Sequence, residues 1–144
     1  MKISITSLNA GFTLAEVVIA IALSAMSMAG LISGYVLSAQ RTEWSVCSEA
    51  AQAQANERIE QTRAARWDPT GAIDELVSTN FPVLVLPLNL PRKTGQYTYC
   101  TNTTTITLIS TNPPFRMIKT ESVWRILNKG LNTNTAVTYR SPDQ

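Results

Sequence analysis

The sequence predicts an α+β chain, with one long N-terminal helix followed by a small antiparallel sheet of three to four strands. An uncharged apolar run extends from Val17 to Leu37, and the next stretch, 40–67, contains no glycine or proline. Residues after Pro82 are rich in Thr, Tyr, Val and Ile in alternating patterns, which is typical of strands. A helix followed by a run of strands is typical of the α+β class.

The apolar run is long enough to cross a membrane. Its roughly 21 residues, at ~1.5 Å each, give a helix of about 32 Å, the thickness of a bilayer's hydrocarbon core. Glu16 stands at its start, and an ionised carboxylate at the bilayer centre costs roughly 2.5–3.5 kcal/mol. Two explanations stay open together. Thr13 and Glu16 fit the capping-box pattern at a helix start, and a second molecule can supply a cation to Glu16.

The motif Gly11-Phe12-Thr13-Leu14-Ala15-Glu16 followed by an apolar helix resembles the class III signal of type IV pilins and type II secretion pseudopilins. The resemblance covers about residues 8 to 45. It implies that a prepilin peptidase cleaves after Gly11 and methylates the new N-terminus at Phe12. It also implies that Glu16 pairs with the N-terminal amine of a neighbouring subunit, and that the fold is pilin-like.

An ordinary secretory signal peptide is the rival interpretation of the same stretch. Its apolar region would run from Leu14 to Met26, with cleavage after Ala29. Three features argue against it. The polar leader ends in glycine, the acidic Glu16 lies inside the apolar region, and this region continues past the cleavage point to Leu37.

The sequence divides into four segments. We expect a leader at 1–11, a transmembrane or filament-core helix at 12–40, a helix continuation that packs on the head at 41–67, and a β-rich head at 68–144. Small or apolar residues recur every fourth position in the third segment and form one stripe that meets the sheet, namely Cys47, Ala51, Ala55 and Ile59. A break into two helices near Gly30 and Gly34 is the alternative to one helix; small residues at this spacing also allow close helix packing in membranes.

The sequence of the head predicts a loop followed by a meander of antiparallel strands. The helix should end at Asp68–Gly71, because the residue before Pro69 avoids the helical region. Residues 70–81 form a loop with one helical turn at 73–77. Strands are predicted at 83–86, 96–110, 117–127 and 135–140, separated by turns at 89–95, 112–114 and 128–130.

Composition gives no support for catalysis. The 144 residues include no histidine and two cysteines, and the formal net charge is +2 without a clustered basic stripe. Without histidine the chain lacks the commonest general base, and with only two cysteines it also lacks the usual zinc ligand sets. Without a clustered basic stripe, nothing in the sequence indicates a nucleic-acid surface. There is also no nucleophile–base pair and no phosphate-binding glycine loop. We therefore expect no enzyme, cofactor or metal.

Two pairs of side chains could serve as a disulfide or as calcium ligands. A disulfide between Cys47 and Cys100 is chemically permitted outside the cytoplasm, although two buried thiols acting as small apolar side chains are the simpler interpretation. Glu121 and Asp143 are the loop carboxylates of the second half, too few for the six to eight oxygens that calcium prefers.

The resemblance implies a structural subunit, first of all a minor pseudopilin of a type II secretion pseudopilus. A minor pilin of a type IV pilus or of a competence pseudopilus is the alternative, and a membrane-tethered binding module that never polymerises is the candidate from another class. The expected partners are other pilin or pseudopilin subunits, a prepilin peptidase, an inner-membrane assembly platform and, before assembly, the lipid bilayer. The chain would lie in a bacterial inner membrane with its head outside the cytoplasm.

Overall fold

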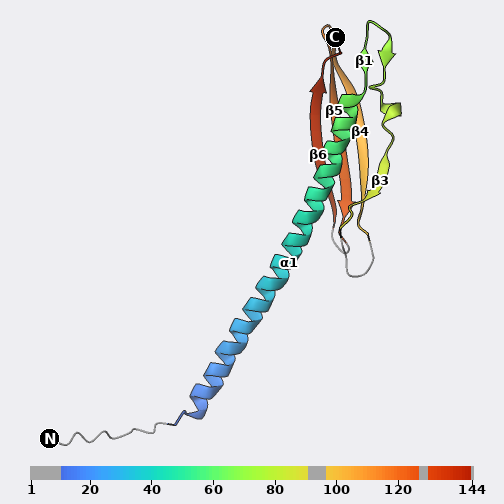
Figure 1. Ribbon diagram of the computed structural model, residues 1–144. Helices are drawn as coiled ribbons and strands as arrows, with labels where there is room; N and C mark the ends of the chain where they lie inside the picture. Colours follow the sequence, from blue (N-terminus) through green and yellow to red (C-terminus); the bar gives the residue numbers. More distant parts are fainter. Residues whose placement is uncertain (1–10, 91–96, 127–129, 144) are drawn as a thin grey trace, which may run out of the picture. The chain divides into compact units, whose positions relative to one another are not determined.

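The computed structural model describes residues 11–90, 97–126 and 130–143, and it has one long helix followed by two antiparallel sheets (Figure 1). The predicted α+β, pilin-like class is confirmed. The leader residues 1–10 and most of the turns predicted at 89–95 and 128–130 lie outside the described residues. The elements are α1 Leu14–Ala64, β1 Trp67–Asp68, β2 Ile73–Asp74, a 3₁₀ turn Ser78–Asn80, β3 Leu84–Pro87, β4 Tyr99–Thr111, β5 Pro114–Arg125 and β6 Leu131–Arg140.

Helix α1 is continuous through Gly30 and Gly34, so the alternative of two helices is not what the structure shows. A Cβ atom added at either glycine would meet nothing within 4 Å. By length and composition α1 can cross a membrane, since its most apolar window has a mean hydropathy of 2.1. The chain divides into two compact units between Arg41 and Thr42.

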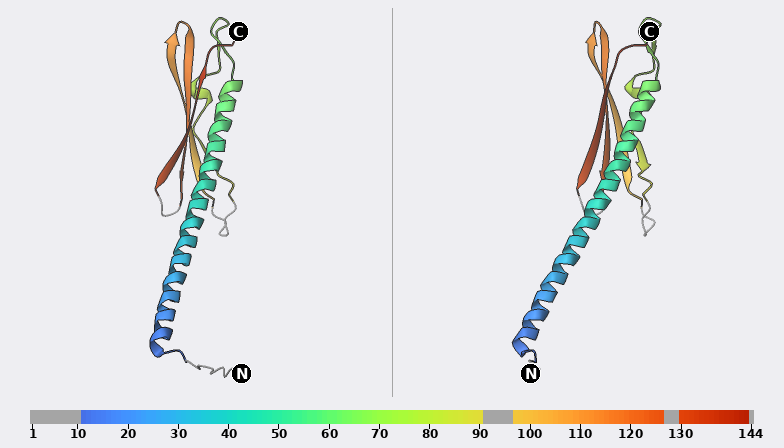
Figure 2. Two further views of the ribbon diagram at one scale, coloured as in Figure 1. Left: turned by 90° about the vertical axis from the view of Figure 1, so that its left-hand side faces the viewer. Right: turned by 60° about the vertical axis from the view of Figure 1, so that its left-hand side comes forward.

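The head unit begins at Thr42 and is a two-layer arrangement. Its four-stranded sheet has the order β3-β4-β5-β6, with every neighbouring pair antiparallel. The last turns of α1 lie against one face of this sheet, as two further views show (Figure 2). β4 and β5 pair from Cys100 opposite Trp124 to Thr111 opposite Pro114, with one register shift after Leu108.

The small-residue stripe of α1 forms the contact with the sheet, as predicted. All four of its members are buried. Cys47 and Ala51 belong to a cluster with Cys100 and Trp124, whereas Ile59 belongs to a second cluster. The second cluster also contains Trp67, Leu76, Phe81 and Ile118.

A polar layer separates these two apolar clusters on the inner face of the sheet. Its members are buried and come from the middle of β4 and β5, namely Asn102, Thr104, Thr120 and Ser122. The Asn102 amide donates to Gln54 Oε1 of the helix at 2.9 Å, and the Ser122 hydroxyl donates to Asn102 Oδ1. Because buried polar groups must find partners, these bonds fix which residues of helix and sheet face one another.

The structure differs from the sequence-based expectation around the end of the helix. The helix stops at Ala64 instead of Trp67, and Trp67–Asp68 pairs with Ile73–Asp74 as a small second sheet. The helical turn predicted at 73–77 is therefore wrong. The Asp68 carboxylate accepts bonds from the Thr70 and Gly71 amides at 2.9 Å, which closes the turn between β1 and β2.

Strand boundaries in the main sheet also shift. β5 begins at Pro114, three residues earlier than expected, because Asn112 and Pro113 alone make the turn. Proline is tolerated as the first residue of a strand, where its missing amide hydrogen is not needed. β6 begins at Leu131 instead of 135.

Candidate processing and assembly site

The residues of the N-terminal motif lie at the first turn of α1. Gly11 and Phe12 precede the helix, and Phe12 is 88% exposed. The Thr13 amide and hydroxyl both donate to Glu16 Oε2, at 2.8 and 2.9 Å, and the Glu16 amide donates to Thr13 Oγ1 at 3.3 Å. This reciprocal pattern is a capping box, so the local explanation for Glu16 holds in the structure.

Glu16 also borders an open groove along the helix, with a volume of about 730 Å³. Apart from Glu16 and Ser24, its lining consists of apolar or small side chains. The lining residues are Phe12, Glu16, Val17, Ala20, Ile21, Ser24, Ala25 and Met28. Within its unit, one helix face thus presents an acidic group at one end of an apolar surface.

Two serines of the apolar segment have their hydroxyl groups bonded within the helix. Ser24 Oγ donates to the Ala20 carbonyl at 2.8 Å, and Ser27 Oγ donates to the Leu23 carbonyl at 2.9 Å. Such a bond to the preceding turn allows a serine in an apolar environment, because its hydroxyl is then paired.

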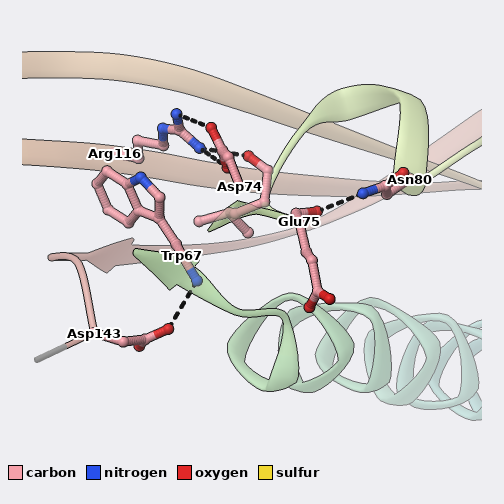
Figure 3. Close-up of polar contacts among 7 residues, drawn as sticks. Trp67, Asp74, Glu75, Asn80, Arg116 and Asp143 are labelled. Carbon is pink, nitrogen blue, oxygen red and sulfur yellow. Dashed lines mark hydrogen bonds and ion pairs between the residues drawn. The ribbon is translucent and has the colours of Figure 1, made fainter. Parts of the chain in front are cut away.

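A second polar cluster, which the sequence did not reveal, holds the end of the helix to the head (Figure 3). Arg116 binds Asp74 through two nitrogens, at 2.6 and 2.7 Å, and its guanidinium lies 4.4 Å from the centre of the Trp67 ring. The Trp67 amide donates to Asp143 Oδ2 at 2.8 Å. Arg140 donates to the carbonyls of Thr62 and Ala65, at 2.8 and 2.7 Å, and so caps the helix C-terminus.

The electrostatics of this second cluster follow from its hydrogen bonds. The fork of Arg116 lowers the pKa of Asp74 below its usual range. The Trp67 amide and then Arg140 lower the pKa of Asp143. Both carboxylates are therefore charged at neutral pH, and both serve to hold the fold together.

The two cysteines lie in one buried cluster, with Cys47 1% and Cys100 0% exposed, and both are thiols in the structure. Burial raises the pKa of the Cys100 thiol. Their pairing stays a prediction.

Glu121 pairs with Lys119 at 2.7 Å, so both carboxylates considered for calcium have partners from the chain itself. Within residues 11–90, 97–126 and 130–143, no group of three or more acidic, cysteine or histidine side chains could hold a metal ion.

Comparison with known families adds one finding. Residues 6–32 match the family model described as the prokaryotic N-terminal methylation motif, which is a class III prepilin signal. No curated protein and no solved structure matches the chain. The chain thus carries this motif at the start of a long apolar helix, as the resemblance of Gly11 to Glu16 implied.

Proposed function

We propose that this chain is a minor pseudopilin of a type II secretion pseudopilus, cleaved after Gly11 and joined to neighbouring subunits through its N-terminal helix. The observation that carries the proposal is the methylation motif at 6–32, which supports a type IV pilin-like or pseudopilin subunit. The long apolar helix supports a membrane anchor before assembly. The small head and the absence of a calcium-type cluster among the described carboxylates favour a minor subunit.

Cleavage after Gly11 would create an amine at Phe12, four residues before Glu16. Thr13 stays in the mature chain, so its bonds to Glu16 Oε2 would survive. No described residue donates to the other oxygen, Oε1, which leaves it available to the amine of a second subunit. The Glu16 carboxylate can therefore form the helix cap through one oxygen and the intersubunit ion pair through the other.

The ion pair would act in assembly as a register device. Removing α1 from lipid exposes its apolar groove, so a bundle with other helices must replace the hydrocarbon. Apolar packing alone fixes the axial position poorly, whereas a buried charge pair is best attested as a device for specificity. Gly30 and Gly34 have open space around them and would allow close approach of a neighbouring helix.

The experiment is complementation of a deletion strain with the full gene, followed by assays of secretion and of surface piliation. A minor pseudopilin restores secretion and is recovered with the other pseudopilins after overexpression of the pseudopilus. Restored piliation or DNA uptake without an effect on secretion would identify a minor pilin or a competence subunit. A chain that is never recovered with any filament, although it reaches the membrane, would support the tethered binding module.

A further inference from the structure

The end of the head at which α1 enters it carries exposed aromatic and apolar side chains. Tyr99 is the first residue of β4, Leu131 is the first residue of β6, and Tyr97 lies two residues before β4. Together with Trp44 of the helix, these side chains are between 48% and 72% exposed. We call these four residues the collar.

Trp44 is held at the same end of the head as the strand residues of the collar. Its indole Nε1 donates to Asn132 Oδ1 at 3.1 Å, and the centre of its ring lies 6.4 Å from that of Trp124. In the ladder Trp124 stands opposite Cys100 on one side and Asn132 on the other. Because Cys100 and Asn132 directly follow the first residues of β4 and β6, the collar is built from helix and sheet together.

The collar follows the apolar span closely along the chain. Helix α1 is continuous from Leu14 to Ala64, and Trp44 stands seven positions after Leu37, the end of the apolar run. Seven residues of helix rise by about 10 Å, whereas the headgroup layer on each side of a bilayer is roughly 5–7 Å thick. Arg41, the first charged residue after Glu16, lies between the two, and basic side chains anchor helices at this boundary. With the apolar run in a membrane, Trp44 therefore lies at the outer edge of the headgroup layer.

The far end of the head differs from the collar in position and not in composition. It too has exposed aromatic side chains, Phe115 and Tyr139. However, Thr138 accepts a bond from Arg63 of the helix at 3.3 Å. Arg63 stands 19 positions after Trp44, which is about 28 Å along α1. Of these two exposed groups, the collar is the one that the chain brings to the membrane surface.

We propose that the collar docks the head onto the surface of the lipid bilayer, with its aromatic rings and Leu131 in the headgroup layer. Tryptophan and tyrosine favour this layer because their rings are apolar while an N–H or O–H group stays hydrated. Anchors of this kind set the depth and tilt of a membrane helix, so the collar would fix how the head stands on the membrane. The inference rests on the membrane anchor of the proposed function and goes beyond it, because it needs no assembly.

The test places a nitroxide spin label on a cysteine introduced by Leu131→Cys or by Tyr99→Cys, with Tyr139→Cys as the matched control. Positions 131 and 139 lie on the same face of β6, about 27 Å apart. Cys47 and Cys100 are buried, and labelling of the unsubstituted chain measures their background. The full chain is reconstituted in phosphatidylcholine vesicles at a low ratio of protein to lipid, and its flotation with the vesicles shows that it is anchored.

The measured quantity is the accessibility of the label to oxygen, which concentrates in lipid, relative to that to a water-soluble nickel chelate. We expect this ratio to be severalfold higher at positions 131 and 99 than at position 139. Adding Tyr97→Ser to the chain labelled at position 131 should lower the ratio, whereas Phe115→Ser at the far end should leave it unchanged. Protease resistance of the head shows whether each variant is folded, and if Leu131→Cys is not, Tyr99→Cys carries the test.

Equal ratios at 131, 99 and 139 in a folded chain that floats with the vesicles would overturn the collar and leave the membrane anchor of the proposed function intact. A high ratio at 131 that disappears on dilution with lipid, together with spin–spin broadening, would show that a second copy covers the collar and would also overturn the proposal. A folded chain that does not float with vesicles would overturn both the anchor and the collar.

Discussion

At the scale of single residues, the proposed function gives Glu16 two roles, a helix cap and an intersubunit ion pair, which one substitution can separate. The Thr13–Glu16 capping box accepts either Glu or Gln at the second position, whereas an ion pair with an amine requires the charge. We expect Glu16→Gln to keep membrane insertion and the helix start but to remove the chain from filaments. Glu16→Ala should lose both the cap and assembly, at a cost of about 0.5–2 kcal/mol in local helix stability.

The measurement is the distribution of the chain between the membrane and the sheared or overexpressed filament fraction. Thr13→Ala is the matched control, since it weakens the cap and keeps the charge. Glu16→Gln recovered in filaments at the wild-type level would refute the ion pair as the assembly device.

Arg116 contacts several residues at the polar end of the head. Its planar fork binds Asp74 twice and stacks on Trp67, a geometry that lysine cannot reproduce. We expect Arg116→Lys to lower the free energy of unfolding by about 1–3 kcal/mol. Denaturant titration of the detergent-solubilised chain followed by circular dichroism measures this. The more exposed Arg66, 4.0 Å from Asp68, is the control, and Arg66→Lys should cost less than about 0.5 kcal/mol.

The carboxylates Asp74 and Asp143 make the stability of the head depend on pH. Their pKa values lie below the ordinary 3.8 in the folded chain. A depressed pKa stabilises the fold above the ordinary value, and this contribution is lost as the pH falls through the folded pKa. We expect constant stability from neutral pH down to about 5, and then a decline that Asp74→Asn and Asp143→Asn each make shallower. Denaturation midpoints measured from neutral pH downward test this prediction. If the midpoint falls equally steeply with pH in the wild-type chain and in both variants, these two carboxylates are not the cause of the decline.

At the scale of elements, the stripe of α1 joins helix to sheet. Ala51 is fully buried beside Cys47 and Trp124, whereas Ala53, two residues on, is exposed. We expect Ala51→Leu to destabilise the head by about 1–3 kcal/mol because extra methyl groups have no space. Ala53→Leu adds the same side chain on the exposed face and should change the free energy of unfolding by less than about 0.5 kcal/mol. Thermal unfolding of both variants decides the matter, and a neutral Ala51→Leu would mean that the helix does not pack as described.

The elements that the sequence could predict are those with local signals. Spacing by four placed Cys47 to Ile59 on one face, and alternation found the four strands of the main sheet. The pairing of Trp67–Asp68 with Ile73–Asp74 could not be found, because it is held by Arg116 and Asp143, which lie far along the chain. The early stop of the helix has the same origin, since Arg140 binds its last carbonyls.

At the scale of the whole molecule, the two parts of the site were predictable to different degrees. Gly11, Phe12 and Glu16 lie within six consecutive residues that the match at 6–32 covers, so their roles in processing and assembly could be proposed from the sequence alone. The polar cluster around Arg116 is a property of the fold. It could not be found in the sequence, because Arg116 and Asp74 lie 42 positions apart.

The central claim is that a membrane anchor becomes a filament joint once its leader has been removed. Mass spectrometry of the N-terminus, on the chain purified from its native host, tests this most directly. We expect a mature protein that begins at methylated Phe12. An intact Met1, or a start at Gly30 after cleavage by an ordinary signal peptidase, would contradict it.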